Sequence, residues 1–135
     1  MNYWLISLPR PDMEHCIKIG TFGQNRKQGI SNVLKGDRVI CCAGKGEWKL
    51  IAAGEVTADY YVDDRPVFLK PGLYPDRFDF NATRFRAEVD LKSIIEQLSF
   101  ITNSAYWPVY FKTGMAKLSH DDWTMIESLK AKTLD

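Results

Sequence analysis

The stretch from Leu34 to Asp64 constrains the fold of this chain more than any other part of the sequence. Arg38–Cys42 is a short apolar run rich in β-branched residues, and Trp48–Val56 resumes a strand after the break at Ala43–Gly46. Gly54 lies inside the second run, where a glycine marks a bulge, a tight barrel bend or the close approach of a ligand or another backbone. The pattern predicts an antiparallel hairpin. Because a lone hairpin is marginal in water, the remaining residues must complete a sheet or barrel around it.

Further strands are predicted on both sides of this hairpin. Asn2–Ser7 alternates and is rich in aromatic residues, and Phe78–Ala82 begins a long strand that continues past a bulge through Arg84–Val89. Trp107–Phe111 is a last strand candidate, and Pro108 indicates that it would be a strand start or a sheet edge. Helical spacing predicts helices at Asp12–Ile19, after the N-cap Asp90, and after the capping-box-like Ser119–Asp122, with one helical turn at Ile30–Leu34. Residues 60–65 are expected to form a loop. The sum is a small, twisted, barrel-like α+β domain.

One domain spanning residues 1–135 is expected, since domains cluster near roughly 100–150 residues. The net charge of +1 argues against binding to nucleic acid or anionic membranes through bulk charge, although a local basic face remains compatible with it. No apolar run approaches the ~20 residues that span a bilayer, and the N-terminus lacks the basic region and cleavage site of a signal peptide. Three cysteines outside any CxxC motif fit free thiols in a reducing compartment. These features predict a cytoplasmic protein without a membrane segment.

Constellations of catalytic residues are scarce in this sequence. The two histidines, His15 and His120, stand beside carboxylates in predicted helix starts and are interpreted as solvated surface residues. No HExxH, no Cys/His ligand spacing and no nucleotide-binding fingerprint occurs, and the glycine–lysine–glycine turn of the hairpin lacks the rest of a P-loop. Asp59, Asp63 and Asp64 are loop carboxylates without other metal ligands. The sequence therefore predicts no metal, no cofactor and no enzymatic activity.

What remains is a set of aromatic residues on or near predicted loops. Slots lined by such rings, with a polar group at one edge, are how proteins hold a nucleobase pulled out of its stack. The polar segment 21–29 is expected to expose Phe22, and Asn25, Ser31 and Arg77 are candidates for the polar edge. The aromatic candidates are Trp4, Phe22, Tyr60, Tyr61, Tyr74 and Trp107. Core packing is the competing explanation for each of these rings.

Several segments occur in an order that resembles a known family. They are YWLIS, FGQN leading to VLKGDRV, the block IAAGEVTADYYVDD, YPDRF, and the C-terminal series LSFI…W…F…LSHDDW, spread from Tyr3 to Leu129. The series resembles the EVE domain family of the PUA-like superfamily, whose relatives include the YTH readers of methylated RNA. The resemblance implies a PUA-like mixed β-barrel of five to six strands with short helices packed against it. It also implies a pocket between barrel and helices for a modified, flipped base in DNA or RNA, and no enzymatic activity.

The resemblance assigns site residues one by one. Phe22 stands where family members often have tryptophan at the pocket entrance, within Phe22–Asn25, and Ser7 is what remains of a Lys-Ser-Glu-Pro segment. Two roles are open for Arg77, a hydrogen bond to a base edge or phosphate, or a surface ion pair at a strand end. Trp107 is either core or pocket wall. The predicted base-binding pocket comprises Trp4, Ser7, Phe22, Gly23, Asn25, Ser31, Tyr74, Arg77 and Trp107, and Arg26, Lys27 and Lys45 are predicted to contact the nucleic-acid backbone.

Three classes of function remain in competition. The leading hypothesis is a non-catalytic nucleic-acid-binding domain that recognises a modified base and carries a basic rim of Arg26, Lys27, Lys45 and Arg77 on one face. The alternative is a protein or enzyme that binds a small, nucleoside-like metabolite in the same pocket, which requires a titratable group there. The candidates for that group are Glu55, Asp59 and Cys41. A protein-interaction module would instead need a contiguous exposed apolar patch. An exposed edge at Trp107–Phe111 would allow a homodimer by strand pairing.

Overall fold

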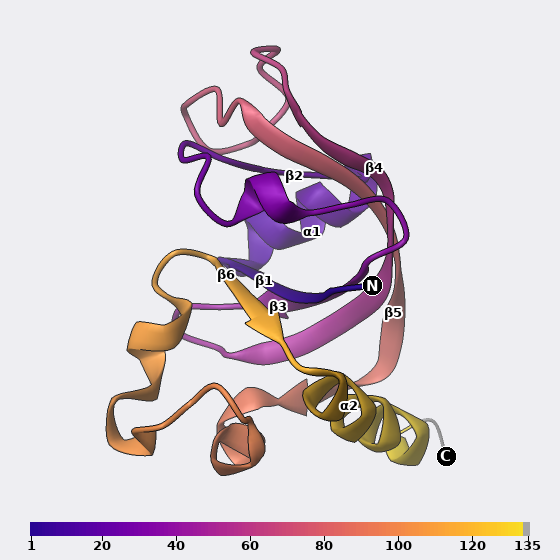
Figure 1. Cartoon of the computed structure of the whole chain (residues 1–135), viewed down its shortest axis with the longest axis vertical. Helices are drawn as coiled ribbons and strands as arrows, with labels where there is room; N and C mark the ends of the chain where they lie inside the picture. Colours follow the sequence, from indigo (N-terminus) through magenta and orange to yellow (C-terminus); the bar gives the residue numbers. More distant parts are fainter. Residues whose placement is uncertain (134–135) are drawn as a thin grey trace.

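The computed structural model describes residues 1–133, and six strands form one mixed sheet that curls into a half-barrel (Figure 1). The strands are β1 (Tyr3–Leu8), β2 (Thr21–Gln24), β3 (Arg38–Ala43), β4 (Lys49–Val62), β5 (Asp76–Asp90) and β6 (Met115–Leu118). Their order is β2-β5-β4-β3-β1-β6; β1 and β3 are parallel and the other pairs antiparallel. The helices are α1 (Arg10–Ile19) and α2 (His120–Thr133), with 3-10 helices η1 (Ile30–Asn32), η2 (Leu91–Gln97) and η3 (Ser104–Phe111). This architecture confirms the predicted α+β mixed barrel with short helices.

The central hairpin of β3 and β4 is confirmed, with its turn at residues 44–47. A Cβ added at Gly54 would lie 1.7 Å from the Asn81 carbonyl oxygen, so the close approach of the β5 backbone explains this glycine. Strand β4 runs on to Val62, and the predicted loop beginning at residue 60 is wrong in its first three residues. The reason is cross-strand bonding, because the hydroxyls of Tyr60 and Tyr61 each donate a 2.6 Å hydrogen bond to an aspartate of β5.

Both faces of the central strands β1 and β3 are buried, because alternation along them sends neighbouring side chains to opposite sides of the sheet. Trp4 and Cys41 belong to the cluster that packs under α1 and η1. Leu5 and Cys42 belong to the cluster covered by η2, η3 and α2. Burial raises the pKa of the Cys42 thiol to about 12. The sheet is therefore a partition between two cores, and a side chain on one face cannot contribute to a site on the other.

Strand candidate Trp107–Phe111 is wrong, because these residues form the 3-10 helix η3. The ring of Trp107 packs edge-on against Trp48, with centroids 5.0 Å apart, and against Phe111 at 6.0 Å. Phe111 also contacts the Trp48 ring, at 5.8 Å between centroids, so the segment is held by aromatic packing and not by pairing with a strand. The proposed route to a homodimer by pairing of this edge loses its basis. The outer position beside β1 is taken by β6, which the sequence did not predict.

Two predicted helix starts are confirmed by their hydrogen bonds. The Asp90 side chain accepts from the Lys92 main-chain N–H, although the helix that follows is 3-10. At α2, the Asp122 carboxylate accepts from the Ser119 N–H while the Ser119 hydroxyl accepts from the Asp122 N–H, as in a capping box. In the part of the chain that the structure describes, none of the helices has the length and apolar character that crossing a membrane requires.

Candidate functional site

Three hollows follow one another along β2 and the loop after it. The lid pocket has a volume of about 60 Å³ and is lined by Leu8, Asp12, His15, Cys16, Gly23, Phe68, Leu69, Lys70 and Tyr74. The apolar groove, about 220 Å³, is lined by Leu8, Phe22, Gly23, Gln24, Asn25, Arg26, Tyr74, Thr113 and Gly114. The seam cleft, about 720 Å³, is lined by Asn2, Trp4, Gln24, Arg26, Gln28, Gly29, Asn32, Thr113, Met115 and Lys117. Gly23 and Tyr74 are common to the first two hollows, and Gln24 and Arg26 to the last two, so the line is continuous.

The lid loop, residues 63–75 between β4 and β5, forms the outer wall of the lid pocket. It is anchored by Arg77, whose side chain is only 1% exposed. The guanidinium donates to three main-chain carbonyls of the loop, those of Arg65, Leu73 and Tyr74, the last two at 2.8 and 3.0 Å. It also lies 3.7 Å from the Asp63 carboxylate and over the Phe68 ring, 5.0 Å from the centroid. A fixed fork of donors therefore holds an irregular loop in one shape.

Tyr74 separates the lid pocket from the apolar groove. It is one of two described non-glycine residues with positive φ, at 44°, a backbone conformation that is uncommon for a tyrosine. The conformation is held by the bond from Arg77 to the Tyr74 carbonyl and by a T-shaped contact between the Tyr74 and Phe68 rings, centroids 5.8 Å apart. Beneath these rings, a Cβ at Gly23 would lie 2.7 Å from the Phe68 ring. The ring reaches the backbone because this position is glycine.

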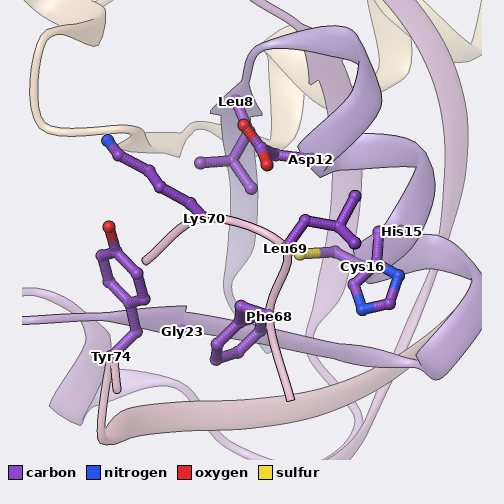
Figure 2. Close-up of a pocket in the computed structure, with 9 residues that line it drawn as sticks. All are labelled: Leu8, Asp12, His15, Cys16, Gly23, Phe68, Leu69, Lys70 and Tyr74. Atoms are coloured by element: carbon purple, nitrogen blue, oxygen red, sulfur yellow. The ribbon is translucent and has the colours of Figure 1, made fainter. Parts of the chain in front are cut away.

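Helix α1 supplies the inner wall of the lid pocket. Asp12, His15 and Cys16 fall at i, i+3 and i+4, so they share one helix face. Figure 2 shows His15 and Cys16 on the opposite side of the view from Tyr74, with Phe68 between them. His15 is half-buried rather than freely solvated, because its Nε2 is 2.7 Å from the Val67 carbonyl and must carry the proton in that bond. Burial, with the nearby charge of Asp12, raises the pKa of the Cys16 thiol to about 12. The thiol is therefore protonated near neutral pH, unlike a nucleophilic cysteine.

The seam cleft lies where the two outer strands of the half-barrel face each other. Its floor is Trp4, which is 4% exposed and whose indole N–H donates to the buried carboxylate of Asp37 at 2.9 Å. The Lys117 ammonium lies 5.9 Å from the centre of the Trp4 ring. The amide of Gln24 joins the two sides, since its Nε2 donates to the Thr113 carbonyl at 2.6 Å.

Five of the predicted pocket residues line these hollows: Trp4, Phe22, Gly23, Asn25 and Tyr74. Phe22, however, is not exposed in a polar loop as expected. It lies in β2 with 0% exposure and packs against Phe78, centroids 5.6 Å apart, because the short strand turns this ring into the core. Phe22 therefore contributes only to the wall of the groove, and its buried ring is not available for a base to stack on.

The other predicted pocket residues lie elsewhere. Arg77 fits neither of the two roles left open for it, because the lid loop surrounds its guanidinium and removes it from the surface. Ser7 is buried near the end of β1, beside its sheet partner Cys42. Trp107 packs on the opposite face of the sheet, and Ser31 lies half-buried on η1. Of the predicted backbone contacts, Arg26 and Lys27 are exposed in the loop after β2, and Lys45 is exposed in the β3–β4 turn.

Apart from Tyr74, the residues of α1 and of the lid loop that wall the lid pocket were not predicted from the sequence. Phe68 belonged to a segment interpreted only as a short apolar piece before the Lys70–Gly72 turn. The signal available was the shared helix face of Asp12 and His15, which places two polar groups side by side. Within the described residues, no group of three or more His, Cys, Asp or Glu side chains is placed to hold a metal ion.

Comparisons with known proteins agree with this architecture. No family model matches the chain. UPF0310 protein PH1033 of Pyrococcus horikoshii is 28% identical over 145 residues, covering 96% of this chain and 99% of that protein. The solved structure of human THYN1 in complex with DNA containing 5-methylcytosine has a TM-score of 0.64 at 10% identity, covering 96% of this chain and 98% of THYN1. The Mmi1 YTH domain has a TM-score of 0.68 at 11% identity, covering 98% of this chain and 76% of that one.

This chain has a PUA-like fold. The two solved neighbours share that architecture over almost the whole described chain, which confirms the fold class expected from the sequence. Membership of the EVE family stays a prediction, since no family model matches. The DNA in the THYN1 structure is a property of THYN1, and the residues of this chain must carry any argument about its own ligand.

Proposed function

We propose that this protein is a non-catalytic reader that takes a modified, flipped base of a nucleic acid into the hollows on either side of Tyr74. The observation that carries the proposal is the meeting of two mostly apolar, aromatic-walled hollows at Gly23 and Tyr74, next to a loop with two exposed cations. A flipped base needs aromatic rings to stack on and a few polar groups to bond its edge, and its phosphate needs basic side chains nearby. The resemblance to EVE domains and the likeness of fold to THYN1 and a YTH domain support the same function.

The base would lie against the Tyr74 ring, with Phe68 and Leu8 covering its other edges. Stacking supplies roughly 1–3 kcal/mol per base, and polar groups at the rim supply identity. The Asp12 carboxylate can accept from an exocyclic amino group, and the Lys70 ammonium can donate to a ring carbonyl. Both side chains line the lid pocket, and the Asn25 amide lines the groove.

Entry of a base into the lid pocket requires the lid loop to move outward. The pocket measures about 60 Å³, well below the roughly 300–1,000 Å³ of typical ligand sites. Two contacts hold the loop down, the bond from His15 to Val67 on the α1 side and the fork of Arg77 on the β5 side. The groove is open at about 220 Å³ and shares Tyr74, so the base would reach the pocket through the groove.

Phosphate contacts fall to Arg26 and Lys27 beside the groove, with Lys45 in the neighbouring β3–β4 turn. All three are exposed, and the Arg26 guanidinium donates a 3.1 Å hydrogen bond to the side-chain carbonyl of Gln28. The predicted fourth member of this rim, Arg77, is only 1% exposed and takes no part in it. Binding should therefore weaken as salt rises, with a shallow slope set by a few contacts.

The site gives less support to the alternative hypothesis, a metabolite-binding protein or an enzyme that uses the same pocket. Of the titratable candidates, Cys41 is buried in the core, Glu55 pairs with Arg38 on the surface of β4, and Asp59 accepts from the Lys35 N–H. None of these three lines any of the three hollows. The thiol that does line the lid pocket, Cys16, has its pKa raised to about 12, which opposes formation of a thiolate.

The test is fluorescence anisotropy with labelled DNA and RNA oligonucleotides that carry 5-methylcytosine, N6-methyladenine or no modification. The variants are Phe68→Ala and Tyr74→Ala, because Phe22→Ala would damage the core as well as the groove. Tyr106→Ala is the matched control, since Tyr106 is 70% exposed on η3 at the other end of the molecule. Urea unfolding of each variant checks that the fold is retained.

We expect one modified oligonucleotide to bind at least about ten-fold tighter than its unmodified twin, in proportion to one stacked base. Phe68→Ala and Tyr74→Ala should remove that preference, and Tyr106→Ala should keep it. Equal affinity for modified and unmodified oligonucleotides throughout would refute the proposal. Binding of the free nucleoside alone, indifferent to salt, would favour the metabolite reading.

A further inference from the structure

The seam cleft is a second large hollow that the base-binding residues around Tyr74 do not occupy. It exists because the half-barrel does not close: β2 and β6 are the two outer strands of the sheet and are not paired with each other (Figure 1). The Gln24–Thr113 bond ties the two sides at one point, and Trp4 forms the floor behind it. The fold therefore leaves a permanent opening of about 720 Å³ beside the groove.

The lining of the seam cleft has a distinctive chemistry. Four of its side chains are neutral amides and two are cations, namely Asn2, Gln24, Gln28 and Asn32 with Arg26 and Lys117. None of the ten described residues that line it is an acid. The carboxylate of Asp37 lies behind the Trp4 floor and accepts hydrogen bonds from the Asn2 N–H, the Leu34 N–H and the Trp4 indole. Its charge is thus engaged by the protein's own donors.

We propose that the seam cleft binds the unmodified nucleotide next to the modified one, with the amides on the edge of its base and Arg26 and Lys117 on its phosphate. An amide offers a donor and an acceptor side by side, which matches the paired donor and acceptor on a base edge. The placement rests on the proposed function, because the apolar groove and the seam cleft share Gln24 and Arg26 as a common wall. A strand whose flipped base enters the groove brings its neighbour to this wall.

A peptide strand added to β6 is the competing occupant, since an outer strand offers unpaired main-chain groups. Strand addition draws its specificity from pockets for alternate side chains. The floor here is one Trp4 ring with its N–H already bonded to Asp37, and the walls are amides and cations. Those groups suit a polar, anionic ligand with a flat edge, so the nucleotide is the better match.

The consequence is sequence context: the protein should prefer one base beside the modified one. The first experiment titrates the four nucleoside 5′-monophosphates into the ¹⁵N-labelled protein and follows the indole N–H signal of Trp4 at the cleft floor. Lys117→Gln should weaken the best binder about five-fold or more, and Lys92→Gln, an exposed lysine near η3, should leave it unchanged. This experiment needs no modified base, so it tests nucleotide binding in the seam cleft even if the proposed function is wrong.

The second experiment measures anisotropy with modified oligonucleotides in which each neighbouring base is varied in turn. Wild type should prefer one neighbour about five-fold or more, in line with one base-edge contact. Asn32→Ala should erase that preference and leave the ratio of modified to unmodified binding intact. Asn81→Ala is the matched control, an exposed asparagine on β5. If the wild-type protein shows no preference for the modified base, that result counts against the proposed function. It does not count against nucleotide binding in the seam cleft.

Two results would overturn the cleft proposal. One is the absence of any change at the Trp4 signal with all four monophosphates, which would leave a peptide strand as the occupant. The other is a context preference that survives Asn32→Ala and Lys117→Gln, because the reading groups would then lie elsewhere.

Discussion

Replacing Arg77 by methionine should detach the lid loop from the barrel. The side chain is 1% exposed, and its donors bind three main-chain carbonyls of residues 63–75 besides facing Asp63 and Phe68. Methionine fills part of the same volume but offers no donor. The loop would keep its chain connections and lose the group that fixes its shape, so Phe68 and Tyr74 would no longer be held over Gly23.

The magnitude follows from the bonds that are lost. Hydrogen bonds to a charged group contribute roughly 1.5–3 kcal/mol each, so three of them set an upper limit of about 9 kcal/mol. The true loss is smaller, because the freed carbonyls lie in an exposed loop and regain water, and because the loop can open while the sheet stays folded. We expect the free energy of unfolding to fall by about 2–4 kcal/mol.

Urea unfolding of Arg77→Met measures this loss, and Arg38→Met is the control. Arg38 pairs with Glu55 on the surface at 3.5 Å, and removing such an exposed pair should cost less than about 1 kcal/mol. Limited chymotrypsin digestion gives a second readout, since cleavage after Phe68 or Leu69 should accelerate in Arg77→Met alone. If the two variants lose the same stability and the loop is digested at the wild-type rate, the anchoring argument is refuted.

Two further predictions concern the core and the pH dependence. Phe22→Ala should lower the free energy of unfolding by about 3–5 kcal/mol, because Phe22 is fully buried against Phe78, and a loss below about 1 kcal/mol in urea would contradict that burial. Hydrogen bonds from the Arg65 side chain and main-chain N–H lower the pKa of Asp63 from 3.8 to about 2. A depressed pKa means that Asp63 stabilises the folded loop above pH 3.8 and loses that contribution as the pH falls towards 2. NMR titration should give a carboxyl midpoint near 2 in wild type and a higher one in Arg65→Gln.

The parts of the fold that the sequence predicted well are those whose cause is local. The β3–β4 hairpin follows from two apolar runs and a glycine turn, and the cap at Ser119–Asp122 follows from residue types at fixed spacing. Strand β2 was missed for the opposite reason. Four residues are too few to show a period of two, and its neighbours are polar, so the burial of Phe22 is decided by pairing with β5.

The candidate site was harder to predict, because its most important contacts do not require particular residue types that a sequence would reveal. Arg77 binds main-chain carbonyls, which every residue possesses, so its partners cannot be recognised from sequence. Trp107–Phe111 is a short apolar run that is compatible with a strand, yet it forms the 3-10 helix η3 and packs on Trp48. By contrast, Gly23 and Tyr74 were identified from ordered motifs, and both lie where the lid pocket meets the apolar groove.

Asp37 and Arg77 are two buried charged side chains beside the site, and each one holds irregular backbone in place through its hydrogen bonds. Asp37 accepts hydrogen bonds from the Leu34 N–H, the Asn2 N–H and the Trp4 indole, and Arg77 donates to main-chain carbonyls of residues 63–75. Removing such a charge alone is costly, because the groups that it bonded lose their partner. Each of the two charges also fixes a geometry beside a hollow: Arg77 holds the lid loop at the lid pocket, and Asp37 bonds the Trp4 indole at the floor of the seam cleft. The sheet itself is held by two apolar clusters, so the polar anchors are concentrated where a ligand must be met with fixed geometry.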